Sequence, residues 1–335
     1  MNPQSVLRRL IARTEAPRAR GQPDANGGQG TRGNSAHLPK GLKLLIVQGL
    51  CEADHGNMSA AVIGLTLFAA VLHATWNAAL RSGVDRLWFV TVMSFATTLA
   101  AIPFALLLPL PATQSWMYLG VSAVLQVVYS IFLAHAYRYG ELGQVYPIVR
   151  GSVPLMVSVG GFLLAGQRLS RPALFGVTLI CLGIMSLAFG RARAGAKSVV
   201  LALATALFVA SYVTADGVGV RFAGNAQSYA AWIFLIYGAL LPLAFLLLRR
   251  GITVDPRSPE TLKAMAGGFI SFLSYGAITA ALALGKVGPI SALRETSIVF
   301  SALLARMVLG EALTRRRILV CIAVTLGAVC IGYAS

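Results

Sequence analysis

The chain has 335 residues, of which 57% are hydrophobic and only 12% are charged, and its formal net charge is +17. Soluble domains carry about 25% charged residues, so this composition excludes an ordinary soluble protein. The cations are spread over short loops instead of one basic face, which argues against a nucleic-acid partner and for a lipid bilayer. Long apolar runs predict an all-α integral membrane protein, because a membrane barrel would show alternating segments of about ten residues.

The first 57 residues differ in composition from everything that follows. They carry 8 Lys and Arg against 4 Asp and Glu and are rich in Gly, Asn and Pro. Such a segment is expected to be disordered, and it lacks a clear signal peptide. Met58 directly precedes the first strong apolar run, so we expect it to be the biological start. The alternative is that residues 1–57 form a genuine basic cytoplasmic tail.

Ten apolar runs are long enough to cross a bilayer, which takes about 20 residues as a helix. Short connections between them predict that neighbouring helices pack antiparallel. The expected spans cover residues 59–80, 87–108, 115–138, 143–165, 172–190, 198–215, 227–248, 262–284, 288–309 and 317–334.

An internal repeat relates the first five spans to the last five. Adding 144 to a residue number carries several matching residues onto each other: Arg150 to Arg294, Gly166 to Gly310 and Gly183 to Gly327. An odd number of spans per half makes the two halves insert in opposite orientations, the inverted-repeat plan of many secondary transporters. We therefore expect two inverted five-helix repeats, residues 58–190 and 198–335, around a central cavity.

The loop charges leave the orientation in the membrane open. The loops after the odd-numbered spans carry most of the cations, which would place both ends of the chain outside by the positive-inside rule. A translated basic tail over residues 1–57 would argue for the reverse orientation.

The chain is similar to the drug/metabolite transporter superfamily, within its EamA-like group of ten-helix carriers. The likeness lies in the two five-helix halves and in the hinge after the fourth helix of each half, GQRLSRP at 166–172 and GEALTRR at 310–316. Glu311 fits the family pattern Gly-Glu-x-hydrophobic-Ser/Thr, whereas Gln167 departs from it. The resemblance implies a basket of helices around a central cavity, no nucleotide cofactor and transport of small organic solutes or drugs. We expect the protein to lie in a bacterial inner membrane.

Motifs for other chemistries are missing from the sequence. GVGV at 217–220 lacks the spacing and the lysine of a phosphate-binding loop, which argues against ATP-driven transport within this chain. The sequence also lacks a Ser-His-Asp pattern and a metal-ligand cluster. We therefore expect neither an enzyme nor a bound cofactor.

Arg150 and Arg294 each fall inside an apolar span, where an unpaired cation is unfavourable by about 2.5 kcal/mol or more. Arginine offers a forked set of donors that suits a carboxylate or phosphate. Both are therefore candidate substrate-binding residues for an anionic or zwitterionic solute. The alternative is that each satisfies helix carbonyls or an internal acid and only holds the bundle together.

Glu295 is interpreted as the only acid well inside a span. A carboxyl group there is a candidate coupling group, which would take up a proton, or a binder of a substrate amine. A pair with Arg150 across the cavity is the alternative. Asp216, at the end of the sixth predicted span, is expected to be an interfacial charge.

His73, Trp76 and Asn77 share one face of the first helix because they are spaced three and four residues apart. They are candidate substrate-binding residues, or else polar contacts between helices. Tyr146 and Tyr275 are candidates too, although aromatic residues near helix ends often form interfacial belts.

Prolines accompany both arginines in the sequence. Pro147 and Pro289 precede them, and Pro154 follows Arg150. Proline removes a helix hydrogen bond, so we expect kinks there that let one half move against the other.

The sequence favours a secondary transporter, specifically an exporter, of small amphiphilic or zwitterionic metabolites such as amino acids. Protons are a possible coupling partner. A flippase or carrier for phosphorylated or lipid-linked solutes is the alternative, since it would need arginines as well. A third hypothesis is an intramembrane enzyme or a sensor that transports nothing.

Overall fold

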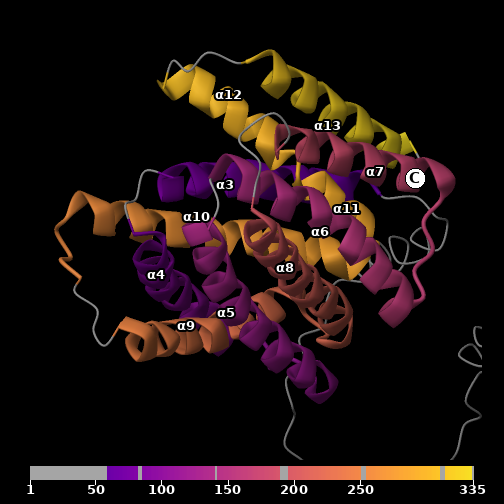
Figure 1. Ribbon diagram of the computed structural model, residues 1–335. Helices are drawn as coiled ribbons and strands as arrows, with labels where there is room; N and C mark the ends of the chain where they lie inside the picture. The colour runs from indigo at the N-terminus through magenta and orange to yellow at the C-terminus, as the bar shows by residue number, and fades with distance from the viewer. Residues whose placement is uncertain are drawn as a thin grey trace, which may run out of the picture. The chain divides into compact units, whose positions relative to one another are not determined.

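The computed structural model describes residues 59–81, 85–139, 142–188, 195–249, 254–309 and 314–333. Every regular element in these ranges is a helix, and ten helical stretches in them are long and apolar enough to cross a membrane (Figure 1). This confirms the predicted all-α membrane fold. The predicted N-terminal extension over residues 1–57 and the hinge residue Glu311 lie outside the described residues.

The first half contains five spanning helices and two short 3-10 turns. In chain order these are α3 (Ala60–Arg81), α4 (Arg86–Leu107), η1 (Thr113–Ser115), α5 (Trp116–Tyr139), α6 (Leu142–Ala165), α7 (Arg171–Met185) and η2 (Ser186–Ala188). Side-chain caps fix two of the helix starts: Asp85 accepts a hydrogen bond from the backbone of Trp88, and Ser170 from that of Ala173.

The second half repeats this order with one helix divided in two. Its elements are α8 (Ala196–Phe222), α9 (Ala226–Arg249), α10 (Pro259–Leu284), α11 (Val287–Arg294), α12 (Ser297–Leu309) and α13 (Arg315–Tyr333). Ser258 caps α10 by accepting a hydrogen bond from the backbone of Thr261. Helix α8 continues past the predicted end at residue 215, and the predicted ninth span consists of α11 and α12.

The ninth span breaks at Glu295 and Thr296, between α11 and α12. The backbone tightens there, since Glu295 donates to the carbonyl of Ala292 and Thr296 to that of Leu293, both at 3.0 Å. The prediction of a kink at Pro289 was wrong. This proline is the third residue of α11, and its missing N–H removes no helix hydrogen bond because first-turn donors have no partner within the helix.

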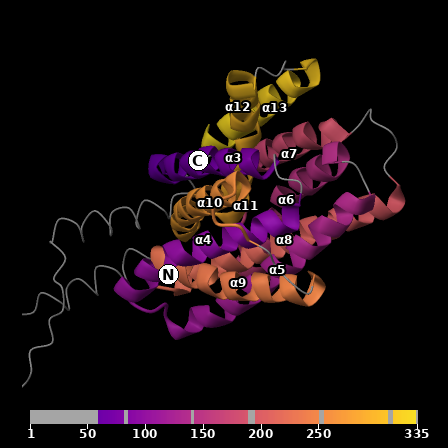
Figure 2. The ribbon, with the colours of Figure 1, turned by 90° about the vertical axis from the view of Figure 1, so that its left-hand side faces the viewer.

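The main contacts between helices of the two halves come in matching pairs, as an inverted repeat requires. Helices α3, α4, α5 and α6 correspond to α8, α9, α10 and the divided helix α11–α12. The main contacts between the halves therefore have counterparts: α5 packs on α8 and α10 on α3, α6 packs on α8 and α11 and α12 on α3. In the same way, α4 packs on α10 and α5 on α9. Two further pairs, α4 with α9 and α7 with α13, join equivalent helices of the two halves (Figure 2). The core thus lies between the halves, not within either one alone.

Helices α7 and α13 approach closely because glycines meet at their crossing (Figure 1). A Cβ atom at Gly176 would lie 2.6 Å from the carbonyl oxygen of Gly327 and 2.8 Å from Ile331. A Cβ atom at Gly327 would in turn lie 2.6 Å from Ile180. Small residues commonly allow such contacts between membrane helices.

Gly176→Val is expected to lower stability by about 1 to 3 kcal/mol, because backbone atoms of α13 occupy the space that the side chain needs. Thermal unfolding of the detergent-purified protein would measure the loss. Gly64→Ala is the matched control, since a Cβ there meets nothing within 4 Å. Equal melting temperatures for Gly176→Val and the unchanged protein would contradict the close contact.

One end of the bundle is closed by contacts between the halves. There the Gln167 amide oxygen accepts a hydrogen bond from the backbone N–H of Val287 at 3.0 Å, and Lys286 donates to the carbonyl of Arg168 at 3.0 Å. Gly166 follows the last residue of α6 and adopts the left-handed conformation, with φ of 62°. This ends the helix and directs the next residue, Gln167, toward Val287 of the second half. This end, which holds the starts of α7 and α11, is called the closed end below.

At the opposite end, the described residues of the two halves are joined by a weaker contact. Arg249 and Asp85 form an ion pair there at 2.8 Å, with side chains 44% and 38% exposed. Exposed pairs of this kind contribute about 0 to 1 kcal/mol. This end, where α3 stops and α13 begins, is called the open end below, because the cavity reaches it.

Candidate functional site

A cavity of about 780 Å³ lies between the two halves. It reaches the open end at Leu80, Leu87 and Arg317. All eight residues predicted from the sequence line it: His73, Trp76, Asn77, Tyr146, Arg150, Tyr275, Arg294 and Glu295. Its volume lies in the range of about 300 to 1,000 Å³ that holds small molecules in other proteins.

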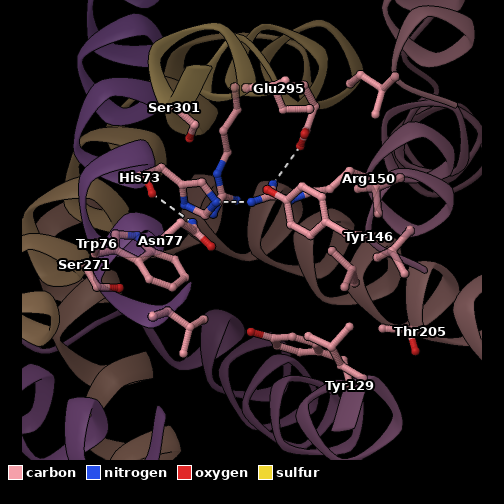
Figure 3. A pocket seen from close by; sticks show the side chains of 18 of the residues that line it. His73, Trp76, Asn77, Tyr129, Tyr146, Arg150, Thr205, Ser271, Glu295 and Ser301 are labelled. Carbon is pink, nitrogen blue, oxygen red and sulfur yellow. Dashed lines mark hydrogen bonds and ion pairs between the residues drawn. The ribbon is translucent and has the colours of Figure 1, made fainter. Parts of the chain in front are cut away.

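Arg150 and Glu295 form an ion pair across the cavity. The Arg150 Nη1 atom donates to Glu295 Oε1 at 2.9 Å, and the two side chains are 15% and 3% exposed. The sequence left this pairing open as an alternative to solute contact. Helix α6 presents Arg150, whereas Glu295 lies in the break between α11 and α12, so the pair bridges the two halves (Figure 3).

His73 lies between the two arginines. Its Nε2 atom contacts a terminal nitrogen of Arg150, and its Nδ1 atom lies 3.2 Å from Arg294 Nη2. Guanidinium groups only donate, and a neutral imidazole has one lone pair. Only one of these two contacts can therefore be a hydrogen bond, and the other sets an N–H group against an N–H group. Around the His73 ring, the guanidinium donors therefore outnumber the acceptor atoms that face them.

Two more polar atoms of the cluster are buried without a hydrogen-bond partner: Arg294 Nε and Glu295 Oε2. Native proteins satisfy nearly all such atoms, so each exception indicates a missing partner or a functional role. With His73 neutral, the two arginines and one glutamate also carry a net charge of +1. The cluster therefore has both charge and hydrogen-bond donors to offer an anion.

The helix break places both charges of the ninth span where they are stabilised. Arg294 is the last residue of α11, and Glu295 lies two residues before α12 begins at Ser297. Cations are favourable at helix C-termini and anions at N-termini, by about 0.3 to 2 kcal/mol each. Broken helices whose ends meet at the binding site are a feature of many secondary transporters.

Aromatic rings form much of the remaining wall. The Tyr146 ring lies 5.5 Å from the Arg150 guanidinium carbon, and Trp76 packs edge-on against His73 at 4.8 Å. Tyr129 lies on the opposite wall, across from Arg150 (Figure 3), and stacks with Tyr212 at 5.4 Å. The cavity thus combines one charged face with aromatic surroundings.

Two cavity residues of the second half were not predicted from the sequence: Tyr212 of α8 and Tyr237 of α9. Both are buried in the middle of their helices. Tyrosines in membrane proteins gather near the interfaces, so a tyrosine in the middle of a span was the available signal.

The prediction that Asp216 is an interfacial charge was wrong. It is 1% exposed inside α8, and its carboxylate accepts hydrogen bonds from Tyr229 at 3.0 Å and from Tyr275. The prediction failed because it ended the sixth span at this acid. Hydroxyl groups of α9 and α10 satisfy the carboxylate, so the helix continues through it. Glu295 is therefore not the only acid inside a span.

Comparison with known proteins agrees with this architecture. Residues 196–333, which coincide with the second predicted repeat, match the EamA-like transporter family. One similar solved structure, described only as the crystal structure of a protein, has 20% sequence identity and a TM-score of 0.65 and covers 81% of this chain and 96% of that one. Such low identity supports the fold alone. A search of curated proteins gave no significant match. Residues 196–333 thus match the EamA-like transporter family, which is part of the drug/metabolite transporter superfamily, and this match suggests a membrane transporter of small solutes; the ten spanning helices make the chain a multi-pass membrane protein.

Proposed function

We propose that this transporter is a bacterial inner-membrane exporter of small amphiphilic or zwitterionic metabolites, with amino acids as the leading class. The observation that carries the proposal is the shortage of acceptors around His73. Arg150 and Arg294 together offer more donors than His73 and Glu295 can accept. A solute carboxylate would supply the missing acceptor oxygens and compensate the net charge of the cluster.

Binding would proceed by exchange of partners at Arg150. A solute carboxylate takes the place of Glu295 on the guanidinium, and the released Glu295 accepts a solute ammonium group or a proton. The exchange avoids leaving either buried charge unpaired, which would be unfavourable by about 3 to 5 kcal/mol. Glu295 is thus proposed as the coupling group, with its partnerless Oε2 atom as the free acceptor.

The aromatic lining supports an amphiphilic solute. Trp76, Tyr146 and Tyr275 reach the cavity beside the charged cluster. Their rings offer apolar contact to the body of a solute and hydrogen-bonding edges to its polar atoms. Asn77 lies with them and donates to the carbonyl of His73 at 2.8 Å, which fixes its side chain.

The proposed direction follows from loop charge. The closed end carries few cations (Arg168, Arg171, Arg221 and Lys286), whereas the loops at the open end carry more. Positive loops stay in the cytoplasm, so the cavity would open to the cytoplasm and load from it. Uptake by inside-out vesicles is the expected result. Uptake by right-side-out vesicles alone would contradict export.

A carrier or flippase for phosphorylated solutes is the second candidate, because paired guanidinium groups bind phosphate as well as carboxylate. Arg150 and Arg294 both contact His73, so one phosphate group near that ring would meet both of them. Phosphonate solutes therefore belong in the same flux assay.

Solute flux in proteoliposomes tests the proposal. Amino acids, phosphonates and cationic drugs are compared, each with and without a pH gradient. We expect flux of zwitterionic amino acids at the highest rate, and higher flux of phosphonates would favour the second candidate. Flux restricted to cationic drugs would contradict both, because the cluster already carries net positive charge.

A further inference from the structure

We infer that Asp216 is a second, proton-binding site, separate from the Arg150–Glu295 pair and linked to the cavity through Tyr275 and Arg294. The existence of the site depends only on the geometry around Asp216. Its role in coupling rests on the proposed transport function.

The carboxylate of Asp216 has neutral hydrogen-bond partners. Tyr229 of α9 donates to Oδ1 at 3.0 Å, and Tyr275 of α10 donates to Oδ2. Neither of the ion pairs Arg150–Glu295 and Arg249–Asp85 includes Asp216, and its carboxylate has no described cation within pairing distance. An ionised carboxylate is strongly unfavourable in a buried site without a counter-ion. A proton would neutralise it.

A proton can reach Asp216 from the cavity. A small side pocket is lined by Asp216 together with Tyr212, Tyr275, Ser291 and Arg294. The last four residues also line the main cavity, whereas Asp216 does not. The acid therefore lies behind the cavity wall, and Tyr275, whose hydroxyl donates to Asp216, lines both spaces.

The other groups around the acid are few. Arg294 of α11 lines the same side pocket as Asp216. Tyr212, one turn earlier on α8, is also near. Helix α6 touches this part of α8 at Gly160, and its residues 156–162 carry no ionisable side chain. Arg294 is therefore the group that a change in the charge of Asp216 would affect most.

Arg294 connects the proton site with the solute site. It lines the side pocket with Asp216, and its Nη2 atom lies 3.2 Å from His73 Nδ1 in the main cavity. Neutralising Asp216 removes a negative charge beside Arg294 and leaves this arginine freer to attract a solute anion. Proton and anion then bind together and move in the same direction, so an accumulated solute would leave with its proton.

The repeat shows that the acid is a feature of one half. In the first helices of the two halves, α3 and α8, an offset of 139 residues pairs Asn77 with Asp216 and Thr66 with Thr205, five fewer than the offset that relates Arg150 to Arg294. The first half thus carries a neutral amide where the second half carries an acid.

Infrared difference spectroscopy of the purified full-length protein tests the site without any solute. A carboxylic-acid band should disappear as pH rises, both in the unchanged protein and in Glu295→Gln, and should be missing from Asp216→Asn. Tyr275→Phe removes one donor and should shift the band, which keeps the test valid if Asp216→Asn does not fold. Identical difference spectra for the unchanged protein, Asp216→Asn and Tyr275→Phe would overturn the proposal.

Gradient-driven flux in proteoliposomes tests the coupling role separately. With an amino acid that the unchanged protein transports, Asp216→Asn should reduce the stimulation by a pH gradient about tenfold. Equal stimulation in both proteins would overturn the coupling role. If no amino acid is transported at all, the proposed function fails, whereas the infrared result still decides whether Asp216 binds a proton.

Discussion

Replacing Arg150 with glutamine is expected to reduce solute flux by about 100-fold or more, because it removes the guanidinium and strands Glu295 as an unpaired buried charge, an effect of about 3 to 5 kcal/mol. His73 loses one of its two arginine contacts in the same step. Flux in proteoliposomes, normalised to protein inserted in the membrane, would measure the effect.

The double variant Arg150→Gln, Glu295→Gln separates solute binding from structural support. Replacing both partners removes the stranded charge, so thermal stability should return toward that of the unchanged protein. Flux should stay low, because the solute still lacks its guanidinium. If flux recovers together with stability, Arg150 serves only to hold Glu295 and the proposed recognition is wrong.

Gly288→Ala is expected to reduce flux by about tenfold, since overpacking a tight contact is unfavourable by about 1 to 3 kcal/mol. A Cβ atom at Gly288 would lie 2.5 Å from the Ser158 hydroxyl oxygen and 3.1 Å from its Cα atom. This contact joins α6 and α11 at the closed end, which must form and open once per cycle if the halves alternate access. The variant would hinder its formation, and flux with a thiol-accessibility assay of the closed end would show both effects.

A compensating change provides the control for this prediction. Ser158→Gly removes the side chain that the new methyl group meets, so the pair Gly288→Ala, Ser158→Gly should regain most of the flux. Gly120→Ala, where a Cβ meets nothing within 4 Å, should transport normally. Unchanged flux in Gly288→Ala alone would show that the tight contact has no part in the cycle.

Hydropathy and the internal repeat were sufficient to predict the fold. Apolar runs of spanning length predicted the ten spans, because a bilayer requires about 20 apolar residues per helix. The repeat that relates Arg150 to Arg294 also predicted that both halves face one cavity, which both residues line. These features depend on local composition and periodicity, which a single sequence displays directly.

Features that depend on partners from distant helices were not predictable in the same way. The burial of Asp216 requires the hydroxyl groups of Tyr229 and Tyr275, and neither lies in its own helix. The break at Glu295 similarly lacks a proline, since Pro289 lies in the first turn of α11. The sequence offered the pairing of Arg150 with Glu295 only as an alternative, because the contact spans 145 positions.

The central claim is that the arginine and histidine cluster binds the anionic end of the solute. Counterflow in proteoliposomes that compares an amino acid with its own amide tests it most directly, since the two compounds differ only in the carboxylate. We predict that the amino acid exchanges across the membrane, whereas its amide exchanges far more slowly. Equal exchange of the two compounds, or faster exchange of the amide, would contradict the claim.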